Sequence, residues 1–175
     1  MALHRQSTKS RNFFSILAVG LLLIGSTAAY VITKADFKGE WNFNEGKSKL
    51  GEGRFRMAAQ KLKVSGEGES LSIERTSNTP NGETATTSEK LTFDGKAAES
   101  TVFGSMKKSS TAAWSASGEE MTVNSVISGE RNGQAFEIKV AEIWKLIDGG
   151  KTLSIDYTST SQRGTTNQTF VYDKQ

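Results

Sequence analysis

The sequence predicts an all-β protein whose body is an antiparallel up-and-down meander, closed into a β-barrel of about 8–10 strands. Short segments rich in Thr, Ser, Val, Ile and aromatic residues alternate apolar and polar positions, which indicates strands with one buried face. Asn-Gly and Asp-Gly pairs separate these segments, and such pairs favour tight hairpin turns. No segment after residue 36 has a sustained helical period. Closing the meander removes the two exposed edges that an open sheet would leave.

The first 35 residues have the layout of a secretory signal peptide or an N-terminal membrane anchor. A basic start is followed by the apolar run Phe13–Gly25 and then by small residues. Cleavage after Ala29 or after Ala35 would leave a small residue at the exit position. Without cleavage, a hydrophobic helix over residues 13–32 would be about long enough to span a bilayer and tether the barrel to the inner membrane. In both cases we expect residues 36–175 to be exported, to a periplasmic or extracellular space.

The charge distribution excludes several classes of function. The chain carries a net charge of +3, but four of its 22 Lys and Arg residues precede residue 36 and no carboxylate does. The body therefore carries 18 cations against 19 carboxylates, so nucleic acid is not an expected partner. His4 is the only histidine and there is no cysteine, which removes His-based triads, Cys nucleophiles, disulfides and the usual zinc sites from the body. We expect a monomer that is not an enzyme and has no cofactor or metal.

Taken in order, the alternating segments predict about ten strands in one domain. They lie at residues 36–43, 54–65, 69–78, 83–93, 96–103, 106–116, 119–128, 134–147, 151–161 and 165–173. Tight turns join all of them except the first two. The connection there, residues 44–53, is glycine-rich and charged, and is either a mobile flap at one mouth of the barrel or a disordered connector.

The first strand carries the pattern Phe37-x-Gly39-x-Trp41, and a Gly-x-Trp at the start of an all-β meander resembles the lipocalins and the wider calycin group. Together with Lys47-Ser48, Asp94-Gly95-Lys96 and the Thr-Ser-Thr-Ser-x-Arg-Gly segment at residues 158–164, it looks like small exported bacterial lipocalin-like proteins, over residues 36–175. The sequence lacks the Cys pair and the second and third motifs of lipocalins. The resemblance implies a binding barrel in which Trp41 packs across the closed end. A basic residue would lie over its ring, with Arg163 as first candidate and Lys174 as second.

Three charged residues fall on otherwise apolar strand faces, namely Arg75, Glu89 and Glu142. A buried charge is costly unless it is paired, and the partner can be a ligand or another side chain. One interpretation is that Glu142 and Arg75 contact a polar head group in a cavity; the other is that they lie at strand ends or pair with each other. The candidate ligand-binding residues are Glu142, Arg75, Trp144, Phe136 and Tyr157. The aromatic members could instead simply fill the core.

The leading hypothesis is therefore a barrel that binds a small apolar or amphipathic ligand without covalent chemistry. The alternative is a rigid barrel that binds a protein or an envelope component through its outer face or loops.

Overall fold

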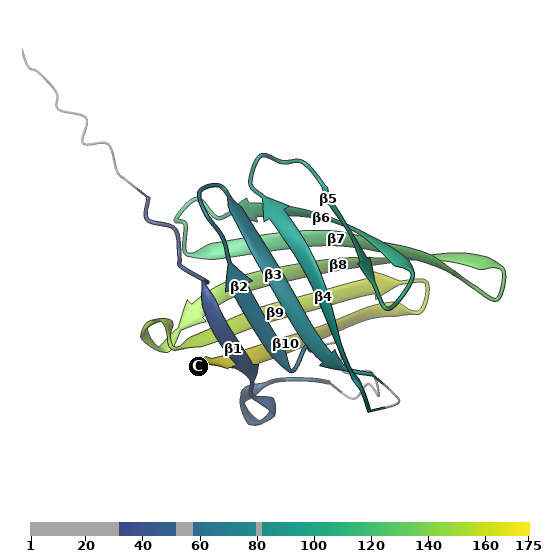
Figure 1. Ribbon diagram of the computed structural model, residues 1–175, viewed down its shortest axis with the longest axis horizontal. Coiled ribbons are helices and arrows are strands. Elements are labelled where there is room, and N and C mark those ends of the chain that lie inside the picture. Colours follow the sequence, from purple (N-terminus) through teal and green to yellow (C-terminus); the bar gives the residue numbers. More distant parts are fainter. Residues whose placement is uncertain (1–31, 52–57, 80–81) are drawn as a thin grey trace, which may run out of the picture. The chain divides into compact units, whose positions relative to one another are not determined.

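A computed structural model describes residues 32–51, 58–79 and 82–175 of the chain (Figure 1). Residues 32–175 form one unit. The expected N-terminal helix lies outside the described residues, and so do residues 54–57 of the second expected strand. Within the described part of the chain, no helix has the length and apolarity needed to span a membrane.

The described residues form ten strands and two short 3-10 turns, and this confirms the predicted all-β class. The strands are β1 (Gly39–Phe43), β2 (Lys61–Ser65), β3 (Ser70–Asn78), β4 (Thr84–Thr92), β5 (Ala98–Val102), β6 (Met106–Trp114), β7 (Glu120–Arg131), β8 (Gln134–Ile147), β9 (Thr152–Ser161) and β10 (Gly164–Lys174). The 3-10 turns are η1 (Glu45–Lys47) and η2 (Asp148–Gly150). Most bounds agree with expectation to within two residues, but β1 begins only at Gly39, β2 begins at Lys61 and β7 continues to Arg131.

The strands form one antiparallel sheet in the order β4-β3-β2-β1-β10-β9-β8-β7-β6-β5. Neighbours in the sheet are neighbours in sequence except at one place, where β1 pairs with β10 and joins the start of the meander to its end. The edges β4 and β5 are consecutive in sequence and are joined by a short turn. The sheet therefore curls into a nearly closed barrel (Figure 1).

The hairpin between β7 and β8 shows why the sequence turns where it does. Asn132 and Gly133 both have a positive φ, 54° and 73°, as the two central residues of a type I′ turn require. Glycine adopts this region freely, and Asn is one of the few other residues that tolerate it. The predicted Asn-Gly hairpin signal is confirmed at this position.

The core is the interior of the barrel, and the inward residues are those that the alternation predicts. Along β7, Met121 and Val123 are completely buried while Asn124 and Val126 between the inward positions are exposed. Along β8, Val140, Glu142 and Trp144 are buried in the same way. The inward phase of β8 therefore carries a carboxylate into the core.

The segment after β1 is held against β10. Lys49 and Thr169 exchange two backbone hydrogen bonds of 2.8 Å, and the Lys47 ammonium lies 2.8 Å from the Asp173 carboxylate. The Ser48 hydroxyl accepts a hydrogen bond from the backbone N–H of Val171. Residues 44–51 are thus fastened to the barrel wall, which corrects the interpretation of this part as a free flap; residues 52 and 53 lie outside the described residues.

Candidate functional site

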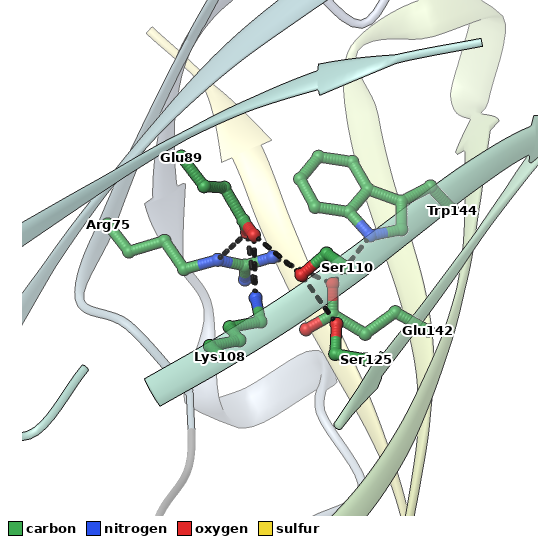
Figure 2. A network of polar contacts seen from close by, with 7 residues as sticks. All are labelled: Arg75, Glu89, Lys108, Ser110, Ser125, Glu142 and Trp144. Carbon is green, nitrogen blue, oxygen red and sulfur yellow. Dashed lines mark hydrogen bonds and ion pairs between the residues drawn. The ribbon is translucent and has the colours of Figure 1, made fainter. Parts of the chain in front are cut away.

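A network of charged and hydroxyl side chains crosses the inside of the barrel (Figure 2). The Arg75 guanidinium on β3 lies 2.7 Å from a carboxylate oxygen of Glu142 on β8 and 3.4 Å from Glu89 on β4. The Lys108 ammonium on β6 approaches both oxygens of Glu89, at 2.8 and 2.9 Å. The Trp144 indole N–H donates to Glu142 at 2.9 Å. The network therefore connects β3 and β4 to the opposite wall of the barrel.

Two hydroxyls extend the network between neighbouring strands. The Ser110 hydroxyl donates to Glu89 at 3.1 Å and lies 2.9 Å from the hydroxyl of Ser125, its partner in the β6–β7 register. Ser125 lies on the inward face that the alternation of β7 predicts, whereas Lys108 and Ser110 are not among the residues singled out from the sequence. Lys108 lies two residues from Met106 and Ser110 two from Ala112, so both share the inward phase of β6. The alternation that singled out Glu142 therefore contained the signal for Lys108.

The charges in the network balance. Its cations are Arg75 and Lys108, and its carboxylates are Glu89 and Glu142. Burial would by itself lower the pKa of Arg75, but the charges of Glu142 and Glu89 outweigh it and raise that pKa above its usual value. Burial would likewise raise the pKa of Glu89, but Arg75 and Lys108 hold it below the usual 4.5. Both shifts favour the charged forms of Arg75 and Glu89 at neutral pH.

This pairing favours one of the two interpretations of Glu142 and Arg75. The two side chains come together as partners, with Glu142 only 6% exposed. The cavity beside the network measures about 20 Å³ and is lined by Arg75, Glu89, Lys108 and Ser100, among others. It has room for about one water molecule, and the Ser100 hydroxyl beside it is buried without a hydrogen-bond partner. The network is a fixed polar core, and ligand contact by Glu142 and Arg75 stays a prediction.

Trp41 has a basic residue over its ring, as the resemblance implied, and that residue is the second candidate, Lys174. Trp41 is fully buried, and the Lys174 ammonium lies 5.2 Å from its ring centroid. The expectation for Arg163 is wrong, because Arg163 lies in the β9–β10 turn whereas Lys174 is the direct register partner of Trp41. Gly39 has a φ of +136°, and a Cβ there would lie 3.0 Å from the Lys174 side chain. The glycine of the Gly-x-Trp pattern therefore leaves room for the lysine.

The far end of the β7–β8 hairpin forms an open groove of about 760 Å³. β7 pairs with β6 only as far as Ser128, and β8 pairs with β9 only from Lys139 onward. The hairpin residues between these two positions therefore extend past both neighbouring strands (Figure 1). The groove is lined by the apolar side chains of Met106, Phe136 and Ile138, and also by Arg131 and Arg163. Among the described residues neither arginine makes an ion pair. Glu130 and Glu137 also line the groove, so the arrangement is an apolar surface bordered by charged groups of both signs.

The five candidate ligand-binding residues thus separate in the structure. Phe136 lines the groove, whereas Glu142, Arg75 and Trp144 belong to the buried network. Tyr157 is 5% exposed and packs on Phe170, with ring centroids 5.1 Å apart, and burial raises its pKa to about 12. Across the described residues, no group of three or more His, Cys, Asp or Glu side chains could hold a metal ion.

No protein-family model matches the sequence, and no curated protein matches it. Among solved structures, the chain is similar to the crystal structure of zebrafish ileal bile acid-binding protein complexed with cholic acid. The TM-score is 0.52 at 15% sequence identity, and the match covers 79% of this chain and 98% of that chain. At this identity the likeness concerns the fold and not the activity. The ten-stranded meander, with Gly39 and Trp41 on its first strand, has the fold of a calycin-like β-barrel.

Proposed function

We propose that this protein is an exported, non-catalytic barrel that binds a small apolar or amphipathic molecule in the groove at the end of the β7–β8 hairpin. The groove carries this proposal. Its volume of about 760 Å³ lies within the usual range of small-molecule sites, and it combines an apolar surface with a few polar groups. The zebrafish protein is by name a bile acid-binding protein, which supports a binding role for a barrel of this kind.

The position of the proposed site follows from the packing of the interior. The cavity beside the buried network holds about 20 Å³, too little for anything larger than water. Displacing Arg75 or Glu142 to make room would separate a pair 2.7 Å apart in a buried setting, which is costly. A ligand therefore gains more by covering Met106, Phe136 and Ile138, which line the groove and are only partly buried. Export rests on the signal-like order of the first 35 residues.

Native mass spectrometry of the full chain, purified from the envelope of the producing cell, tests the proposal. We expect a co-purifying small molecule, and we expect added decanoate to bind as a probe. Phe136→Ser should abolish both signals, because it removes the largest apolar side chain of the groove. Phe103→Ser is the matched control, since Phe103 is 62% exposed in the β5–β6 turn and does not line the groove. Absence of any bound molecule, or equal loss in both variants, would contradict the proposal.

A second candidate function uses the outer face of the sheet. Val126 and Ile143 are exposed on the outward phase of β7 and β8, at 36% and 39%. A depression of about 360 Å³ beside Val126 is lined by Ala141, Thr158 and other residues of β6–β9. This surface favours a binding partner in the envelope. A photo-crosslinking residue at position 126 that yields one discrete protein adduct, with none from position 103, would favour this candidate.

A further inference from the structure

Residues 32–35 precede the first strand, yet they pack on the β6–β7 turn and on aromatic side chains beside it. The Ala35 backbone N–H donates to the Gly118 carbonyl at 2.9 Å. The Lys34 ammonium lies 5.5 Å from the ring centroid of Phe93 and 5.8 Å from that of Trp114. It also lies 3.1 Å from the Glu69 carboxylate. A cation over two aromatic faces is favourable, so this segment contributes to the packing beside this turn.

The loop beneath this segment is shaped to receive it. Gly118 has a φ of +76°, and a Cβ at this position would lie 2.8 Å from Ile32 and 3.1 Å from the Thr33 carbonyl. The first contact is closer than real Cβ atoms show and the second is tight, so a Cβ at position 118 would push residues 32–34 away from the β6–β7 turn. Phe37 continues the same packing, because its ring stacks on Trp114 with centroids 5.5 Å apart. The chain is thus part of the folded unit from Ile32 onward.

From these contacts we infer that residues 32–35 remain on the mature protein, so that any processing occurs upstream of Ile32, at Ala29, and not after Ala35. Cleavage after Ala35 would remove the Lys34 ammonium from Phe93 and Trp114 and would leave Phe37 as the second residue of the chain. Cleavage after Ala29 keeps every contact that the structure shows for this segment. The inference rests on the proposed export, because only an exported chain meets the processing enzyme.

The intact mass of the full-length protein, expressed in a bacterium with a general secretory pathway and separated into cytosol, membrane and periplasm, tests the inference. A periplasmic chain that begins at Tyr30 is the expected result. A periplasmic chain that begins at Asp36 would overturn the inference and leave export intact. An uncleaved chain in the membrane fraction would overturn processing, and an uncleaved chain in the cytosol would overturn export itself.

Two glycine variants of the full chain test the packing separately from the processing. Gly118→Ala and Gly104→Ala place a Cβ at similar backbone angles, φ +76° and +87°, but Gly104 has no atom within 4 Å of that Cβ. Both variants should therefore pay the same backbone strain, and only Gly118→Ala should also displace residues 32–34. We expect Gly118→Ala to lower the melting temperature by about 3–8 °C more than Gly104→Ala. Equal melting temperatures would overturn the packing of this segment on the barrel.

Discussion

Replacing Glu89 with glutamine should destabilise the barrel far more than a comparable change on the surface. Glu89 is the carboxylate that contacts the Lys108 ammonium, and the Glu89 and Lys108 side chains are only 5% and 8% exposed. Glutamine keeps the shape of the side chain but removes its charge. Lys108 would then be left in the barrel interior with no carboxylate partner among the described residues.

The magnitude follows from which partners survive. Removing one member of a buried ion pair costs about 3–5 kcal/mol. Because Arg75 keeps Glu142 at 2.7 Å, we expect Glu89→Gln to cost about 3 kcal/mol, the lower end of this range. Lys108→Met should cost less, about 1–2 kcal/mol, since Glu89 keeps Arg75 and the Ser110 hydroxyl. The double variant should be more stable than Glu89→Gln alone, because it leaves no unpaired ammonium.

Urea unfolding followed by tryptophan fluorescence measures these differences, provided that the m-value is unchanged. The matched control is the Lys145–Glu120 pair, whose charged atoms are 2.9 Å apart but whose side chains are 46% and 40% exposed. Glu120→Gln should cost less than about 1 kcal/mol, because water screens an exposed pair. If Glu89→Gln and Glu120→Gln cost the same, or if the double variant is no more stable than Glu89→Gln, the buried network does not hold the barrel as we argue.

Three further predictions concern pH and the basic partner of Trp41. Because the pKa of Glu89 in the folded protein lies below its usual value of 4.5, the ionised carboxylate stabilises the fold at pH values above 4.5. This contribution should be lost as the pH falls below 4.5 and through the lowered pKa, so the free energy of unfolding in urea should decrease less steeply with falling pH in Glu89→Gln. Burial raises the pKa of Tyr157 to about 12, so its neutral phenol stabilises the fold below pH 10, and this contribution should be lost as the pH rises through about 12. In a titration followed by ultraviolet phenolate absorbance, Tyr157→Phe should lack the ionisation step near pH 12. Lys174→Met should lower the unfolding free energy by about 0.5–1 kcal/mol, since it removes the cation from the Trp41 ring, while Arg163→Met should leave it unchanged in the same urea assay.

The strands could be predicted from the sequence because their signals are local. Alternation along residues 134–147 and the Asn132-Gly133 pair each involve neighbours in the chain, and both predictions are confirmed. The choice of Arg163 over Lys174 failed for the opposite reason. Which of them meets Trp41 depends on the register between the first and last strands, and that register is a property of the closed sheet.

The candidate site shows the same division. Alternation identified Arg75, Glu89 and Glu142 as charges on apolar faces, and it left open whether Arg75 and Glu142 meet a ligand or each other. Arg75 and Glu142 are 67 residues apart in sequence and meet only because the barrel brings β3 opposite β8. Lys108 lies on the inward phase of β6 and gave the same local signal. Alternation shows which side chains point inward but not which of them meet, so the contacts of the buried network could not be predicted from the sequence. The groove beyond β6 and β9 depends on where strands of unequal length end in space.

By itself, the sequence determined the order of the strands, the position of the turns, the inward phase of each strand and the absence of histidine and cysteine chemistry from residues 36–175. These properties depend on residue type and on spacing over a few positions. The tertiary structure alone decided that the two edges of the sheet are β4 and β5, that the central charges pair with one another and that an open groove lies at the β7–β8 hairpin. The physical reason is that a charge or an apolar side chain takes its role from the atoms opposite it, and in a barrel those atoms come from distant parts of the chain.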